Sequence, residues 1–385
     1  MSSPAHAFAA ACAAGFTAGW CATNVGAIPS EIASAYGIGL AAVGLFTTAL
    51  FLTHMATQIP GGKLSDRFGA RRVSVLGMAV LAGANAIALI APDPALGLGA
   101  RLLAGVGMGL GWIAATAYLR ATGGSAFLLG LFGGIALAGG GVALAVVPQL
   151  EPALSWRASY WTALVVTLAS LLLLALAPAD TEHLSRPRGA GARAGILRDP
   201  RLLRLAALFS VSYGLSLVVA NWVVEILVRH GGLDNATAGL VGAAILLAGL
   251  VSRPLGGWAL GRRPEWTRAA LGLCLVGGAA STVAILIAEP LWLAALGCAM
   301  LGVAAGVPFA PLFMGASATR PDAPGAAVGL VSGANALTVL VATPLLGLTF
   351  SLPGDGQIGF AIVAALWIAA LWLLRSGRAL EATGS

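Results

Sequence analysis

The 385-residue chain is 59% hydrophobic and only 9% charged, and its mean hydropathy is +0.93. A soluble protein of this length carries roughly a quarter charged residues, so the composition excludes an ordinary water-soluble domain. The net charge of +7 would fit a nucleic-acid partner, but membrane topology explains it more simply.

Apolar runs of about twenty residues, the length that crosses about 30 Å of hydrocarbon, alternate with short charged segments. They predict an all-α membrane protein with twelve transmembrane helices. The N-terminal AHAFAAACAAGF is interpreted as part of the first span, because no basic residue precedes it as in a signal peptide. The runs cover residues 6–28, 39–59, 73–91, 95–118, 126–148, 158–178, 204–228, 236–258, 269–288, 291–316, 326–349 and 358–375.

The basic residues predict the orientation. If both termini are cytoplasmic, Arg157 and Arg229 lie outside, Arg101 and Arg253 lie within spans, and the other Lys and Arg residues are all on the inner side. This positive-inside bias predicts a multi-pass cell-membrane protein, in a bacterium the inner membrane, and no nucleic-acid partner. The four cysteines lie in apolar runs and are expected to pack between helices, without disulfides or metal.

The first two spans carry polar side chains at helical spacing. Trp20 and Asn24 share one face of the first span, and His54 lies on the second. Each is a candidate for a substrate cavity, although polar groups in membranes also join helices by hydrogen bonds. His54 is the only histidine within a span and could carry a coupling proton, but a neutral packing histidine is the preferred interpretation.

The loop after the second span reads GKLSDRFGARR, residues 62–72. Its glycines permit a tight turn, and its carboxylate could pair with nearby arginines or cap a helix of the opposite half as a cytoplasmic latch. The loop resembles the signature loop of the major facilitator superfamily. The resemblance implies coupling or gating roles for Gly62, Asp66, Arg67, Gly69, Arg71 and Arg72.

Arg101 lies within the fourth span, nearer its outer side, and is followed by GVGMGLG, which together with it resembles the fourth-span motif of the same superfamily. A coupling or structural role and an anion contact are equally compatible with Arg101. The glycine run lacks the strand–turn–helix context of a nucleotide-binding loop, so it predicts close helix packing and no cofactor. In the fifth span Ile135 follows Gly134, where superfamily antiporters have a Gly-Pro pair, which weakens a drug-efflux interpretation.

A polar segment divides the chain into similar halves. GVGMGLGW (105–112) aligns with GVAAGVPF (302–309), and GLFGG (130–134) with GLVSG (329–333). Two six-helix repeats around a midplane site are a transporter architecture. The expected bodies are residues 1–178 and 204–385, joined by a cytoplasmic linker at 179–203. Because Gly261 replaces Asp66 in the second copy, a latch should be built mainly by the first half.

The second half adds further candidates. Tyr213 and Asn221 lie in the seventh span and Asn335 in the eleventh, and Asn235 is expected to cap the eighth helix. Glu225 aligns with Glu31 at the outer end of the first span, so it is interpreted as a rim residue, with a proton carrier as the alternative.

Arg253 is the most informative residue of the chain. It lies eight residues before Gly261, about 12 Å along a helix of about 1.5 Å per residue, and none of the 14 Asp and Glu is placed at the membrane centre. A central arginine costs about 2.5–3.5 kcal/mol on insertion, so it usually faces a cavity. Its planar fork suits bidentate capture of an oxyanion, and the missing counterion is therefore expected to be the cargo. The alternative is a structural arginine bonded to backbone carbonyls, which Pro254 would favour by freeing the Leu250 carbonyl.

Resemblance supports the anion. The pattern Arg253-Pro254-x-x-Gly257 is similar to the substrate-binding region of oxalate and monocarboxylate carriers. Nitrate porters also place an anion-binding arginine in this span, but they carry a second arginine in the second span, where this chain has His54. This difference argues against nitrate as the cargo. The sequence thus predicts a secondary transporter of a small organic anion. The candidate substrate contacts are Arg253, Trp20, Asn24, His54, Tyr213, Asn221 and Asn335.

Two rivals remain open. A proton-coupled drug exporter would need an embedded acid, for which Glu225 is the candidate. An enzyme or sensor would need clustered catalytic groups or an output domain, whereas the four histidines are scattered along the chain. We expect no enzymatic activity, no metal and a monomer that uses proton symport or anion exchange.

Overall fold

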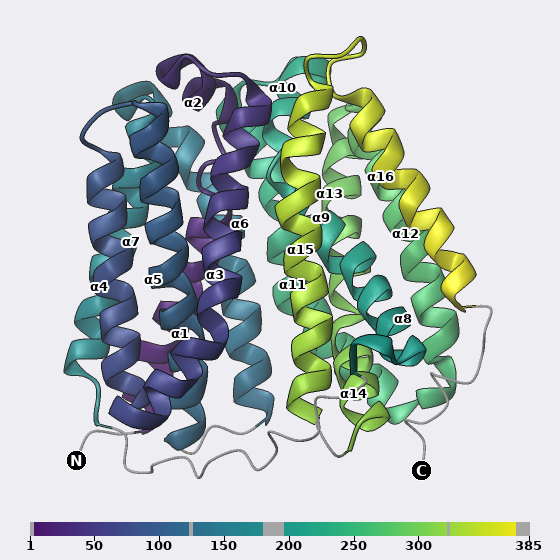
Figure 1. Cartoon of the computed structure of the whole chain (residues 1–385). Helices are drawn as coiled ribbons and strands as arrows, with labels where there is room; N and C mark the ends of the chain where they lie inside the picture. Colours follow the sequence, from purple (N-terminus) through teal and green to yellow (C-terminus); the bar gives the residue numbers. More distant parts are fainter. Residues whose placement is uncertain (1–3, 123–125, 180–195, 322–323, 375–385) are drawn as a thin grey trace.

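The computed structural model describes residues 4–122, 126–179, 196–321 and 324–374 (Figure 1). Within these ranges the chain is helical and has no strand. Of the predicted linker, residues 180–195 lie outside the described part, as do the arginines 186, 188 and 193 that contributed to the charge bias. The linker is flanked by a helix that ends at Leu176 and one that begins at Pro200.

The described residues of the first half form seven helices. They are α1 (Pro4–Thr23), α2 (Pro29–Tyr36), α3 (Leu40–Phe68), α4 (Ala70–Ala88), α5 (Pro94–Ala121), α6 (Ala126–Leu154) and α7 (Arg157–Leu176). α2 is a short helix between the first two spans, and the other six cross the predicted membrane.

The second half has more interruptions. Its elements are η1 (Ile196–Arg198), α8 (Pro200–Phe209), η2 (Ser210–Gly214), α9 (Leu215–Ala220), α10 (Val223–Gly231), α11 (Asn235–Arg262), η3 (Pro264–Trp266), α12 (Thr267–Ile287), α13 (Leu291–Gly306), α14 (Phe309–Thr319), α15 (Pro324–Thr349), α16 (Gln357–Ala369) and η4 (Ala370–Leu374). The seventh span is built from α8, η2, α9 and α10, and the tenth from α13 and α14. The predicted runs 204–228 and 291–316 are therefore single spans made of broken helices.

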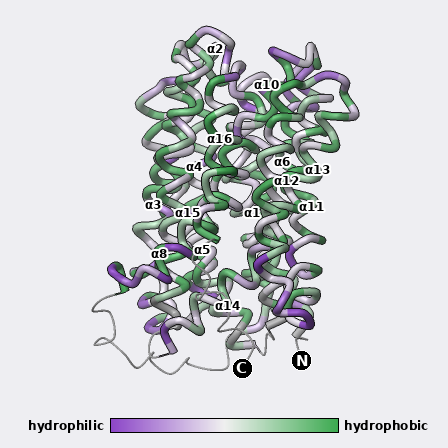
Figure 2. The backbone as a smooth tube through the Cα atoms, turned by 90° about the vertical axis from the view of Figure 1, so that its right-hand side faces the viewer, coloured by the Kyte–Doolittle hydropathy of each residue, from purple (hydrophilic) through white to green (hydrophobic). Residues whose placement is uncertain are grey.

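The twelve predicted spans are all present as helices. Ten segments are long and apolar enough to cross a membrane, and α1 and α4, with 20 and 19 residues, complete the twelve. Their middle zone is apolar, and hydrophilic residues gather toward the two ends of the bundle (Figure 2). The twelve-helix, two-repeat architecture is confirmed.

Small residues let the helices approach closely. A Cβ on Gly107 of α5 would lie 2.5 Å from the Leu81 nitrogen of α4, and one on Gly19 of α1 would lie 1.7 Å from the Ala136 oxygen of α6. The glycine run in the fourth span therefore packs helices, as predicted. The four cysteines are buried, as predicted for helix-packing residues.

We name the two ends of the bundle after the helices that mark them in Figure 1, the α2 end and the α14 end. The halves touch closely toward the α2 end, where a Cβ on Gly239 would lie 2.3 Å from the Leu144 oxygen and one on Gly44 would lie 2.6 Å from the Pro344 Cα. These contacts join α11 to α6 and α3 to α15.

The same helix faces separate toward the α14 end. A Cβ on Gly134 of α6 would still lie 3.2 Å from Leu250 of α11, and the Thr48 hydroxyl of α3 donates to the Leu340 oxygen of α15 at 2.6 Å. One turn from Gly134 and two turns from Leu340, a Cβ on Gly130 or Gly333 would meet nothing within 4 Å. The halves are thus closed at the α2 end and parted at the α14 end.

Candidate functional site

Arg253 lies in the middle of α11 and is 7% exposed. Within the described ranges it forms no ion pair, because the pairs found there join Arg229 to Glu225 and to Asp355. Its Nε and Nη2 are buried and have no hydrogen-bond partner. The alternative of an arginine satisfied by backbone carbonyls therefore lacks support for these two atoms.

Aromatic rings cover the guanidinium instead. The Arg253 Cζ lies 4.6 Å from the Tyr213 ring centre and 4.1 Å from that of Phe309. The negative faces of the rings attract the cation but accept no hydrogen bond in the guanidinium plane. Nε and Nη2 donate along a single edge of the guanidinium, the edge that grips a carboxylate or phosphate through two parallel bonds. The free donors of Arg253 therefore match one oxyanion group.

Arg253 lines a small pocket between the halves. The pocket is about 10 Å³, roughly the room of a single water molecule, so an organic anion would require it to widen. Only Arg253 among the lining residues carries a charge. The lining comprises Leu137, Tyr213, Ser216, Ile245, Leu246, Gly249, Arg253, Gly302, Ala305 and Gly306.

An irregular helix positions Tyr213. The segment η2 is a π-helix that interrupts the seventh span at Ser210–Gly214, and such widened turns are frequent at functional sites. A Cβ on Gly214 would lie 2.9 Å from Asn335 Oδ1, which is itself buried without a partner. Tyr213 thus lines the Arg253 pocket, and Asn335 lies beside the segment that carries it.

The structure does not bring Trp20 and Asn24 to this pocket. Trp20 Nε1 donates to Thr162 Oγ1 at 3.2 Å, and Asn24 Nδ2 donates to the Ser159 oxygen at 2.9 Å. Both partners belong to α7 in the same half. Their common face is the one that joins α1 to its neighbours, and it does not line the Arg253 pocket.

The Arg101 guanidinium donates hydrogen bonds from all three of its nitrogens, unlike that of Arg253. It is 1% exposed and donates to the Cys21 oxygen at 2.9 Å, Asn24 Oδ1 at 3.2 Å and the Phe46 oxygen at 3.3 Å. These neutral acceptors come from α1, the end of α1 and α3. Of the roles left open for Arg101, the geometry favours the structural one.

His54 and Asn221 also lie outside the pocket lining. His54 Nε2 contacts the Gln58 amide nitrogen at 2.8 Å on α3, and its Nδ1 is buried without a partner. Asn221 marks the break between α9 and α10, where a Cβ on Gly26 would lie 2.7 Å from Asn221 Oδ1. Asn221 therefore belongs to the contact between the halves near the α2 end.

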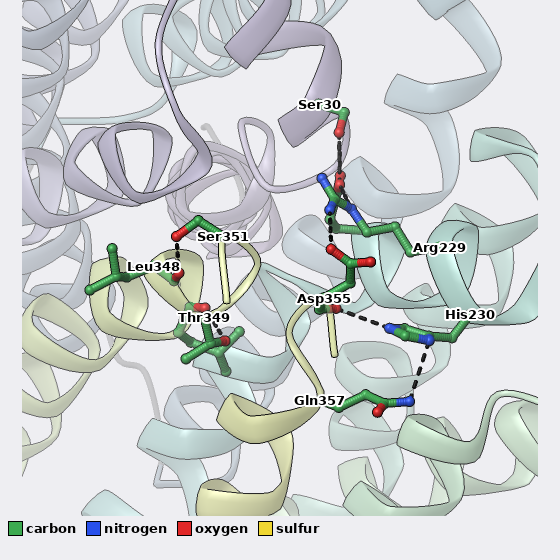
Figure 3. Close-up of polar contacts among 10 residues, drawn as sticks. Ser30, Arg229, His230, Leu348, Thr349, Ser351, Asp355 and Gln357 are labelled. Carbon is green, nitrogen blue, oxygen red and sulfur yellow. Dashed lines mark hydrogen bonds and ion pairs between the residues drawn. The ribbon is translucent and has the colours of Figure 1, made fainter. Parts of the chain in front are cut away.

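Glu225 takes part in a polar cluster that joins the halves at the α2 end. It is 3% exposed, and the Ser30 hydroxyl donates to its two oxygens at 2.7 and 2.8 Å. Arg229 Nε pairs with Glu225 at 2.5 Å, and Nη1 of the same arginine reaches Asp355 at 3.2 Å. His230 contacts the Asp355 oxygen at 3.0 Å (Figure 3). The position fits a rim residue.

The signature loop lies at the α14 end. Gly69 has φ +92, a backbone conformation that favours glycine, and it separates α3 from α4 as the tight turn required. Arg71 donates to the last carbonyls of α7, to Leu174 at 2.9 Å and to Ala175. The side chains of Asp66, Arg67 and Arg72 are exposed. Within the described ranges Asp66 forms no ion pair, which agrees with halves parted at this end.

The sequence reasoning missed Phe309, Gly133 and Ser216. Phe309 follows Pro308 at the break between α13 and α14, and a Cβ on Gly133 of α6 would lie 3.8 Å from Arg253 Nη1. Ser216 lines the pocket two residues after the π-helix. The available signal for Phe309 was an aromatic residue beside a proline within a span.

Comparison with known proteins gives one consistent picture of the fold. The family model of the Major Facilitator Superfamily matches residues 8–343. Solved structures with the same fold include a nucleoside transporter (TM-score 0.77, 12% identity, 98% of this chain and 100% of that one) and a D-xylose–proton symporter (0.78, 14%, 98% and 98%). A third is a human organic anion transporter (0.69, 18%, 97% and 100%).

A curated relative carries a more specific name. A protein of Cupriavidus necator named as a probable sulfoacetate transporter is 26% identical over 255 residues, which make up 61% of this chain and 59% of the relative. The match thus spans less than two thirds of that relative's length.

Proposed function

The chain belongs to the major facilitator superfamily, and from this premise we propose that it carries a small organic anion across the membrane by alternating access, with Arg253 binding the charged group. That it is a membrane transporter of a small molecule agrees with its family and with its relatives. The anion, its direction and its coupling are what is proposed.

One observation carries the proposal. Arg253 is a buried cation between two rings, and both donors of one guanidinium edge are without a partner in the described protein. A buried charge is stable only when it is paired, so an anionic ligand supplies what the protein itself lacks. The name of the Cupriavidus necator relative is consistent with an organic anion.

The proposal also covers the movement of the halves, the driving force and the location of the protein. Parting at the α2 end would expose the pocket to the opposite side, and proton symport or anion exchange would drive transport without a nucleotide. We further propose a bacterial inner-membrane location with both termini cytoplasmic, transport without enzymatic chemistry, and a monomeric unit. The drug-exporter alternative gains no support, because Glu225 is engaged by Ser30 and Arg229.

The test uses the purified full chain. A thermal-shift screen against carboxylates, sulfonates, inorganic oxyanions and lipophilic cations should show stabilisation by organic anions. Arg253→Gln should abolish that stabilisation, and Arg253→Lys should retain a small part of it, because lysine keeps the charge but loses the planar fork. Stabilisation by cations alone, or unchanged anion binding in Arg253→Gln, contradicts the proposal.

Uptake into proteoliposomes then separates binding from transport. Anions that stabilise the protein should enter vesicles containing the native chain and should not enter vesicles containing Arg253→Gln. Addition of a proton gradient or of internal anion identifies the driving force.

A further inference from the structure

The hydrogen-bond donors and charges that line the pocket limit the charge of the molecule that it can bind. Arg253 is the single cation of the pocket lining, and Nε and Nη2 on one edge of its guanidinium are buried without a partner. That edge accommodates two oxygens of one carboxylate or one sulfonate. A second acidic group on the same molecule would need a separate cation.

The pocket lining holds no second cation. Its other residues are apolar or glycine except for Tyr213 and Ser216, and the Ser216 hydroxyl already donates to the Ser212 oxygen at 2.7 Å. Arg101, the other buried arginine of the spans, is engaged by three neutral acceptors on α1 and α3. His54 does not line the pocket.

We propose that the Arg253 pocket selects anions with a single negative charge over dianions of the same size. This inference rests on the proposed function and refines it. The rings of Tyr213 and Phe309 cover the guanidinium, and apart from Ser216 the Tyr213 hydroxyl is the one neutral polar group of the lining. A neutral hydroxyl donates one hydrogen bond but supplies no positive charge, so a second negative charge would lose its hydration with little compensation, whereas a neutral polar or apolar tail would not.

The ligand that this pocket would prefer therefore differs from the cargo in the relative's name. Sulfoacetate carries a sulfonate and a carboxylate, two acidic groups attached to one methylene carbon. A pocket whose lining holds a single cation can pair with only one of these two acidic groups. The monoamide of the same compound, in which a neutral amide replaces the carboxylate, would fit better.

The experiment compares matched pairs on the native protein without a proton gradient. Binding is measured by calorimetry in detergent at neutral pH for succinate against succinamate, and for sulfoacetate against its amide. Each pair has nearly the same shape and differs by one charge. We expect the monoanion of each pair to bind at least about tenfold more tightly, since an unpaired charge within the membrane region is strongly unfavourable.

Acidification provides an internal check. Protonating the second carboxylate converts a dianion into a monoanion, so the affinity for sulfoacetate should rise as the pH falls, while that for its amide should stay constant. A shared rise would reflect titration of the protein and would count against the inference.

A variant tests the missing cation directly. Leu137 of α6 lines the pocket, and Leu137→Lys adds one positive charge to the opposite half at similar side-chain volume. It should raise dianion affinity relative to the native chain, and Leu137→Met, the matched apolar control, should not. If Leu137→Lys fails to fold, the matched pairs on the native protein still decide.

The outcomes are distinguishable. Equal or tighter binding of the dianions by the native chain overturns the inference and leaves the proposed anion transport standing. Failure of every monoanion and dianion to bind overturns both.

Discussion

The two buried arginines of the spans differ in what surrounds them. Arg101 donates to three oxygens, whereas Nε and Nη2 of Arg253 have no acceptor. Burial of Arg253 therefore carries a desolvation cost that the two neighbouring rings offset only in part. Arg101 is thus satisfied within the protein, whereas the proposed ligand of Arg253 would supply the missing acceptor.

Replacing each arginine with methionine should therefore change stability in opposite directions. Arg253→Met removes an unpaired buried cation and should stabilise the ligand-free protein by about 1 kcal/mol while abolishing anion binding. Arg101→Met leaves three acceptors without their donor and should destabilise it by at least about 2 kcal/mol. Unfolding in detergent with and without anion measures both. Destabilisation by Arg253→Met in the absence of anion would mean that the protein itself satisfies this arginine.

The two glycines of the signature loop make a second matched pair. Gly69 has φ +92, whereas Gly62 lies inside α3, where an added Cβ would meet nothing within 4 Å. Gly69→Ala should destabilise the protein by about 1–2 kcal/mol, and Gly62→Ala should be neutral or stabilising by up to about 1 kcal/mol. Thermal unfolding tests the difference in sign. Loss of transport in a stable Gly62→Ala variant would reveal a need for close approach in another state of the cycle.

At the residue scale, the sequence could indicate features that depend on the residue itself but not those that depend on neighbouring helices. Arg253 stood out because a charge in an apolar run is rare, whatever surrounds it. Trp20 and Asn24 share a face, as predicted, but helical spacing does not reveal which helix that face meets. The predicted cap Asn235 was wrong by one position. Asp234 caps α11, and hydrogen bonds from the Thr237 backbone and hydroxyl hold the pKa of that exposed carboxyl below its usual range.

At the scale of elements, irregular helices carry the pocket aromatics. Tyr213 lies in the π-helix η2, and Phe309 begins α14 after a break at Val307–Pro308. The sequence predicted each of these spans as one apolar run, because hydropathy does not record a widened or interrupted turn. Proline at 308 was a visible signal for the second break, while η2 contains no proline.

The short helices α2 and α10 form the polar contact that spans the halves at the α2 end. The Ser30 hydroxyl donates to Glu225 across this contact, and a hydrogen bond to a charged group is worth about 1.5–3 kcal/mol. Ser30→Ala should therefore shift the balance toward forms parted at the α2 end by roughly tenfold or more. The control is Ser351→Ala, whose hydroxyl bonds the Leu348 oxygen within one half (Figure 3).

Spin labels on exposed positions at that end provide the measurement. Cysteines placed at Ala95 and Leu352 lie on opposite halves, and the four native cysteines are buried and should not be labelled. Ser30→Ala should increase the population with a long label distance, and Ser351→Ala should leave the distribution unchanged. Identical distributions in both variants would show that Ser30 does not hold the halves together.

At the scale of the whole molecule, the pseudo-symmetric sequence folds into halves that contact each other unequally at their two ends. The apolar runs predicted the twelve helices, the internal repeat predicted the two bodies, and the motif at residues 62–72 indicated the family. They could not predict which end is closed, because both states of an alternating-access cycle share one sequence and differ in contacts between halves. The Gly239–Leu144 and Gly44–Pro344 contacts at the α2 end supply this information.

Alternating access requires that the α2 end opens during each cycle. Gln149 Nε2 of α6 donates to the Ala236 oxygen of α11 at 3.1 Å, across the halves at that end. Cysteines at these two positions joined by a short, reducible bifunctional reagent should hold the end closed. Uptake into proteoliposomes should then stop, anion binding in detergent should persist because the α14 end stays parted, and reduction should restore uptake. The same reagent on cysteines at His230 and Gln357, which contact each other within one half, should leave uptake intact. Full uptake by the cross-linked Gln149–Ala236 pair would mean that cargo crosses without separation of the halves at the α2 end.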